Sequence, residues 1–134
     1  MPTEQQYLDM VINKTSVLPR MCIRIIGAIM NEGGDEEINF PTEHMVKYIE
    51  TLGAAFQIQD DLIAIISEVY QTERGCLCED IHEGKRTLMV INSLQSHKLT
   101  EASKYRLVSI LDMRTLDEAL LQEAIDLLYK SGSV

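Results

Sequence analysis

The sequence predicts an all-α protein, a helical bundle with no convincing strand. Apolar residues recur at intervals of three and four in most segments, the spacing that places them on one face of a helix. Two stretches also begin with a capping box, Thr3 with Gln6 and Thr115 with Glu118. At 134 residues the chain suits one domain, so we expect a single domain over residues 1–134.

The first helix is expected from residue 4 to about residue 16, and Pro19 is expected to interrupt it. Residues 20–30 are nearly all apolar, which is typical of a buried helix. A polar, glycine-containing loop is predicted for residues 31–39, with the acidic residues 35–37 facing solvent.

Pro41 opens the next predicted helix, because its missing N–H costs nothing in a first helical turn. This helix ends near Tyr70 and carries the adjacent Asp60 and Asp61. Residues 71–85 are expected to form a loop or short turn, followed by an apolar helix over residues 87–96.

Two more helices complete the prediction. Thr100 starts one that runs to about Met113. The last begins at the Thr115–Glu118 capping box and ends at Gly132, where a C-terminal cap belongs. Its apolar face is expected to consist of Leu116, Ala119, Leu120, Ala124, Leu127 and Leu128.

Charge and composition exclude several function classes. A formal net charge of -9 repels nucleic-acid backbones, so we expect no nucleic-acid partner. The longest apolar run, residues 21–30, is too short to span a membrane. Three cysteines, Cys22, Cys76 and Cys78, form no paired disulfide framework and favour a reducing compartment. We predict the cytoplasm, or an organelle if the chain belongs to a larger assembly.

The strongest chemical signal is Asp60 next to Asp61 in an otherwise apolar helix. Burying such charges is costly unless a metal or a partner neutralises them. Gln57 lies one turn earlier and projects toward the same patch. Farther on, Asp80, Lys85 and Arg86 supply another carboxylate and two cations. Carboxylates for a hard cation together with cations for phosphate oxygens are what a magnesium diphosphate site requires.

Three blocks in order make the chain resemble the carboxyl half of a trans-isoprenyl diphosphate synthase, or polyprenyl synthetase, of the geranylgeranyl type. They are Lys14-Thr15, then Gly-Ala-Ala-Phe-Gln-Ile-Gln-Asp-Asp from Gly53 to Asp61, then Glu79-Asp80-Ile81 with Glu83-Gly84-Lys85 and Thr87-Leu88. The resemblance covers essentially the whole chain and implies an all-α bundle corresponding to roughly half of the isoprenyl synthase fold.

The resemblance implies head-to-tail prenyl transfer, in which magnesium ions help an allylic diphosphate depart and isopentenyl diphosphate attacks the carbocation. By that resemblance Lys14 and Lys85 bind the allylic diphosphate, and Thr15, Phe56 and Gln57 lie beside the substrate. Asp60, Asp61 and Asp80 are implied to hold Mg²⁺, Asp80 by ordering the metal's waters or Lys85. We also expect both ammonium groups and the Asp60 and Asp61 carboxylates to meet at one cavity.

The chain departs from the family pattern. The family's first aspartate-rich region has no counterpart here, Ala64 replaces the third acid of the second region, and Gly75 or Arg74 stands where a diphosphate-binding lysine is usual. We therefore expect a prenyl diphosphate-binding subunit that is inactive alone and needs a homo-oligomer or a partner chain carrying the missing half. The alternatives are a non-catalytic remnant, a pseudoenzyme acting as a structural or interaction subunit, and a truncated product. An exposed apolar wall is expected in either main case.

Overall fold

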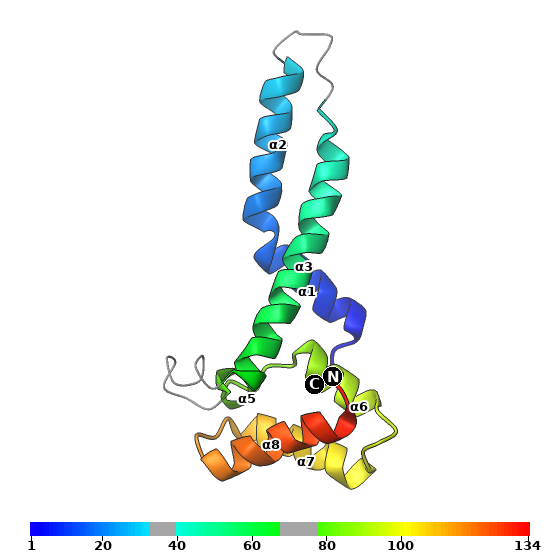
Figure 1. Cartoon of the computed structure of the whole chain (residues 1–134), viewed down its shortest axis with the longest axis vertical. Helices are drawn as coiled ribbons and strands as arrows, with labels where there is room; N and C mark the ends of the chain where they lie inside the picture. Colours follow the sequence, from blue (N-terminus) through cyan, green and yellow to red (C-terminus); the bar gives the residue numbers. More distant parts are fainter. Residues whose placement is uncertain (33–39, 68–77) are drawn as a thin grey trace. The chain divides into compact units, whose positions relative to one another are not determined.

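The computed structural model describes residues 1–32, 40–67 and 78–134. Within these ranges it contains seven α-helices and no strand, which confirms the predicted all-α class (Figure 1). Contacts divide the chain into two compact units. Unit one consists of Met1–Tyr7 and Ile58–Val134, and unit two of Leu8–Gln57. The single domain over residues 1–134 stays a prediction.

Helices α1 (Glu4–Thr15), α2 (Val17–Glu32) and α3 (Thr42–Ile66) supply the described helical residues of unit two. The Thr3–Gln6 capping box is confirmed, since Thr3 N donates to Gln6 Oε1 at 2.9 Å and Gln6 N donates to Thr3 Oγ1 at 3.2 Å. The break after α1 comes at Ser16. Pro19 itself is the third residue of α2, a first-turn position that needs no N–H partner within the helix.

In unit two α2 and the first part of α3 run side by side in opposite directions (Figure 1). Arg20 of α2 pairs with Glu50 of α3 at 2.7 Å, and Ser16 Oγ donates to the Glu50 carbonyl. The helix expected over residues 20–30 is present, but its predicted burial is wrong. Met21, Ile25 and Ile29 are more than half exposed, because α3 covers only one side of α2 in unit two.

Unit one is built around α8 (Glu118–Ser131), which contacts α5 (Glu79–His82), α6 (Leu88–Gln95) and α7 (Glu101–Met113). The predicted helices of residues 87–96 and 100–113 are therefore confirmed, and a one-turn helix lies in the segment expected to form a loop or turn. Their shared core consists of Ile65, Cys78, Ile81, Met89, Val90, Leu107, Ile110, Leu111, Leu121, Ala124, Ile125 and Leu128.

The ends of α8 confirm one predicted cap and correct another. Gly132 ends the helix in the left-handed region, at φ 79°, as expected. The Thr115–Glu118 capping box is wrong, because Asp117 is the N-cap and accepts from the amides of Ala119 and Leu120. A carboxylate next to the helix start took this role in place of the threonine two residues earlier.

The buried face of α8 is also rotated from the predicted one. Leu116 and Ala119 are exposed, whereas Leu121 and Ile125 are buried. Because the helix begins after Asp117, Leu116 lies outside it and cannot continue its apolar face. Ala124 and Leu128 are in the core as predicted.

Some predictions fall outside the described residues: the solvent-facing acids at residues 35–37, the alternatives Arg74 and Gly75, and Cys76. Of the described cysteines, Cys22 and Cys78 are free thiols. Among the described helices, none combines the length and the apolar character needed to cross a membrane.

Candidate functional site

In unit one the centre of the candidate site is the contact between α1 and α3. Tyr7 Oη donates to Asp61 Oδ2 at 2.7 Å, and only 3% of Tyr7 and 7% of Asp61 are exposed. Burial, the hydrogen bond to Asp61 and the negative charges of Asp61 and Asp80 all raise the pKa of Tyr7 well above its usual value near 10. Tyr7 therefore stays protonated and donates to a buried carboxylate, and Asp80 lies near enough to raise the pKa of Tyr7.

A tight turn after α5 brings Lys85 back to Asp80. Gly84 has φ 71°, a left-handed conformation that favours glycine, and a Cβ there would lie 2.6 Å from the carbonyl oxygen of Leu111. The turn is closed by Lys85 N donating to the Asp80 carbonyl at 2.9 Å. The Lys85 ammonium can then reach Asp80 Oδ1 at 2.7 Å and Glu83 Oε2 at 2.6 Å.

Two carboxylates hold Lys85 in its charged form. Partial burial alone would lower the pKa of Lys85, but the hydrogen bonds to Asp80 and then to Glu83 outweigh it and raise the pKa above its usual range. Asp80 and Glu83 thus share the Lys85 ammonium in this part of unit one. Since carboxylates outnumber the ammonium, a diphosphate would be repelled here unless it arrives with divalent cations.

Arg86 is engaged elsewhere. Its guanidinium donates to the Gly84 carbonyl at 2.7 Å and pairs with Asp112 of α7. His82 Nδ1 also contacts the Thr115 carbonyl at 3.1 Å. Arg86 and His82 therefore fasten the turn to the remainder of unit one, and Lys85 is the cation of this turn that is paired with Asp80.

In unit two the structure joins two of the predicted substrate residues. Thr15 Oγ1 at the end of α1 donates to Gln57 Oε1 of α3 at 3.0 Å. Lys14 is exposed beside Thr15, and Phe56 next to Gln57 is 64% exposed. Lys14 belongs to unit two and Lys85 to unit one, so the meeting of both amines with the two aspartates at one cavity stays a prediction.

The acidic residues of unit one suit magnesium by their chemistry. Mg²⁺ takes oxygen ligands and is commonly held by one or two carboxylates together with substrate phosphates and water. Within residues 1–32, 40–67 and 78–134 no group of three acidic, histidine or cysteine side chains could hold a metal. The residues present fit a cation that a diphosphate brings with it, and the assignment of Asp60, Asp61 and Asp80 as ligands stays a prediction.

Two residues that bond to the predicted site residues, Tyr7 and Glu83, were not themselves predicted from the sequence as site residues. Tyr7 has the helical spacing of a core position, and nothing in that spacing indicates that its hydroxyl meets a carboxylate 54 residues away. From the sequence, Glu83 was named only as part of the Glu83-Gly84-Lys85 motif, without a role of its own. Its salt bridge to Lys85 depends on the left-handed turn at Gly84.

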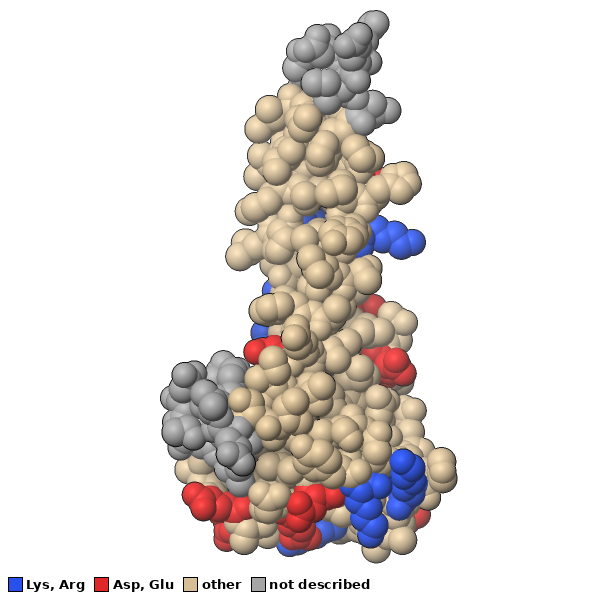
Figure 2. Space-filling view, viewed as in Figure 1, with Lys and Arg blue, Asp and Glu red and all other residues tan. Residues whose placement is uncertain are grey.

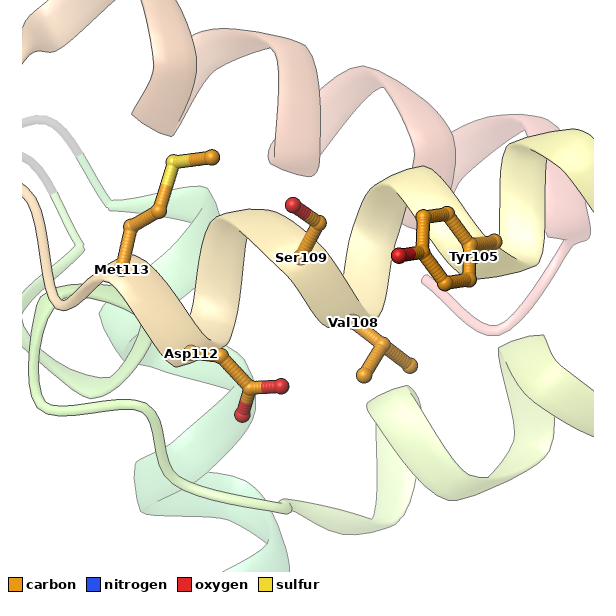
Figure 3. Close-up of a pocket in the computed structure, with 5 residues that line it drawn as sticks. All are labelled: Tyr105, Val108, Ser109, Asp112 and Met113. Atoms are coloured by element: carbon orange, nitrogen blue, oxygen red, sulfur yellow. The ribbon is translucent and has the colours of Figure 1, made fainter.

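A surface hollow in unit one lies apart from these residues. It is lined by one face of α7, namely Tyr105, Val108, Ser109, Asp112 and Met113 (Figure 3). Its charged group is the Asp112 carboxylate, which is already paired with Arg86. None of the predicted site residues lines it, so we do not assign the diphosphate site here.

The helices of the described residues place the chain among all-helical proteins. The family model of the polyprenyl synthetases matches residues 1–128, which is nearly the whole chain. The chain therefore belongs to the polyprenyl synthetase family, as its motifs had indicated.

Named relatives agree. The chain is 35% identical over 130 residues to a short chain isoprenyl diphosphate synthase of Methanocaldococcus jannaschii, covering 97% of this chain and 37% of the relative. It is 32% identical over 133 residues to a geranylgeranyl pyrophosphate synthase of Dictyostelium discoideum, covering 99% and 39%. A geranylgeranyl pyrophosphate synthase of Hypoxylon pulicicidum is 36% identical over 132 residues, with 98% and 31% covered. No solved structure matches the chain significantly.

The chain therefore spans between 31% and 39% of the length of these relatives.

Proposed function

We propose that this chain is a partial isoprenyl diphosphate synthase-like subunit that holds the second magnesium-diphosphate site of head-to-tail prenyl transfer and needs a partner chain. The observation that supports this most is the arrangement of Tyr7, Asp61, Asp80 and Lys85 in unit one, where a buried carboxylate and a carboxylate-held ammonium lie within the span that matches the family. The names of the relatives agree with a prenyl diphosphate substrate.

When bound, magnesium would neutralise the charge that develops on a departing diphosphate. The chain's own residues prepare for that charge. Asp60 and Asp61 offer carboxylate oxygens from α3, and Lys85 is kept protonated at the turn after α5. In unit two the Thr15 hydroxyl and the Gln57 amide are aligned with each other, so Gln57 can present its side chain to a substrate in a fixed orientation.

The need for a partner is supported by the surface of unit two. Apolar side chains are exposed along α2 and α3, and a shallow hollow on α2 is lined by Val17, Arg20, Met21, Arg24, Ile25 and Ala28. In the view of Figure 2 the surface over α2 and the first part of α3 is mostly uncharged. Apolar patches of this kind mark interaction sites, so we propose a homo-oligomer or a partner chain with the complementary half of the fold.

A second candidate is a non-catalytic prenyl synthase remnant that serves as an interaction subunit. Two observations favour it: the described residues contain no ready three-ligand metal group, and Lys85 is already neutralised by Asp80 and Glu83. In this case the exposed faces of α2 and α3 would be the functional part.

Calorimetry separates the two. A non-hydrolysable prenyl diphosphate is titrated into the purified chain, alone and with its native partner, with and without magnesium. The subunit proposal expects binding that depends on magnesium and is weakened about 10–100-fold by alanine at both Asp60 and Asp61. Asp126→Ala, an exposed carboxylate on α8, is the matched control and should bind as the wild type does. Absence of binding under all conditions favours the interaction subunit.

A further inference from the structure

The position of Tyr7 is fixed by several hydrogen bonds, although this residue lies near the start of the chain. The Thr3–Gln6 capping box fixes the beginning of α1, and Tyr7 N donates to the Thr3 carbonyl at 3.0 Å. The phenol is almost completely buried and reaches Asp61 in the middle of the chain. The first turn of α1 thus holds the Tyr7 hydroxyl in a fixed position next to Asp61.

The Tyr7 hydroxyl contacts the Asp61 carboxylate, and the orientation of that side chain decides whether the hydrogen bond can form. A 2.7 Å O–H···O⁻ contact is a charge-assisted hydrogen bond, and the buried Asp61 carboxylate would lose this donor in any other rotamer. Because breaking a charge-assisted hydrogen bond to a buried carboxylate is costly, the bond favours one orientation of the side chain. Asp60 precedes Asp61 on the same helix, so a fixed Asp61 limits how the pair can share a ligand.

We propose that Tyr7 is a positioning residue that holds the Asp61 carboxylate in one orientation and thereby sets the affinity of the Asp60–Asp61 pair for magnesium diphosphate. This rests on the proposed function, because it concerns the same diphosphate site. A merely structural bond that ties α1 to α3 would stabilise the fold and leave the binding constant unchanged.

The experiment compares wild type, Tyr7→Phe and Tyr105→Phe in the full chain. Tyr105 on α7 is 78% exposed and supplies the matched loss of a phenolic hydroxyl away from Asp61. Magnesium and inorganic diphosphate are the probes, with affinity measured by calorimetry. Three-bond NMR couplings of Asp61 measure the population of its χ1 rotamers without ligand, and circular dichroism checks the fold.

The proposal expects a single Asp61 rotamer in wild type, averaged rotamers in Tyr7→Phe, and an affinity about tenfold weaker in that variant. Tyr105→Phe should match wild type in both measurements. Equal affinity of wild type and a folded Tyr7→Phe overturns the role of Tyr7 and leaves the proposed function standing. Averaged rotamers in wild type overturn the role of Tyr7 even where Tyr7→Phe fails to fold. Absence of diphosphate binding by wild type overturns both.

Discussion

At the scale of single residues, the account depends on which charged groups meet. Asp60 and Asp61 could be selected from the sequence because two adjacent carboxylates in an apolar helix need a neutralising partner. The identity of one partner, Tyr7, could not be predicted from the sequence. A tyrosine at a helical core position shows the same spacing whether or not its hydroxyl forms a hydrogen bond. Lys85 was predicted, whereas its second carboxylate, Glu83, depends on the backbone of one turn.

The burial of Tyr7 predicts a late ionisation. Its pKa is raised in the folded chain, so the stability linked to its protonated form is fully present below the unfolded value near 10 and is lost as the pH rises through the folded value. Ultraviolet titration at alkaline pH should show one tyrosine that ionises only well above pH 10 or on unfolding. Tyr7→Phe should lack that phase, and its persistence would place the late ionisation at another tyrosine.

At the scale of elements, the sequence predicts helices better than their ends and faces. The helices of residues 87–96 and 100–113 follow from apolar spacing and turn residues, and the structure has both within a residue or so. The start of α8 was wrong because two N-cap candidates, Thr115 and Asp117, lie two residues apart, and spacing alone cannot choose between them. The predicted burial of α2 was wrong for a related reason. An apolar run shows only that a helix surface can pack against other apolar side chains. Its exposed fraction depends on which neighbouring residues cover it.

The correction at α8 can be measured. Asp117→Ala should lower the free energy of unfolding by about 1 kcal/mol, since the carboxylate accepts from two otherwise unpaired amides. Glu118→Ala removes the glutamate of the capping box expected from sequence and should cost only a few tenths of a kcal/mol. Urea unfolding of both variants measures the two losses of stability. A larger loss for Glu118→Ala than for Asp117→Ala would support the Thr115–Glu118 capping box instead.

The turn that carries Lys85 gives a second test at this scale. Gly84→Ala and Gly132→Ala each place a side chain at a positive φ, which costs roughly 1–2 kcal/mol. At Gly84 the new Cβ would also meet the Leu111 carbonyl at 2.6 Å, whereas at Gly132 it meets the end of the flexible Lys98 side chain at 2.4 Å. Gly84→Ala should therefore lose more stability in urea unfolding. Equal losses would mean that the turn does not lie against α7.

At the scale of the whole molecule, the sequence predicts an exposed apolar surface, and the described part of the chain exposes large apolar side chains along α2. Ile29 is 68% exposed in unit two, with Met21 and Ile25 nearby on the same helix.

Ile29→Glu should weaken self-association or partner binding about tenfold or more, because a charge in an apolar interface must be desolvated without a partner. His44→Glu makes a similar charge change at an exposed polar position of α3 in the same unit and serves as the control. Sedimentation velocity over a range of concentrations measures both. The same oligomeric state for wild type and Ile29→Glu would exclude this face of α2 from the interface.

The central claim is that the Asp60–Asp61 pair and Lys85 of unit one hold a metal-bridged diphosphate. Manganese in place of magnesium, bound with a non-hydrolysable prenyl diphosphate, broadens the NMR signals of nearby amides in an isotopically labelled chain. The account predicts broadening around Asp60, Asp61 and Lys85. Signals of these residues that stay sharp, or broadening spread over exposed carboxylates such as Asp126, would contradict it.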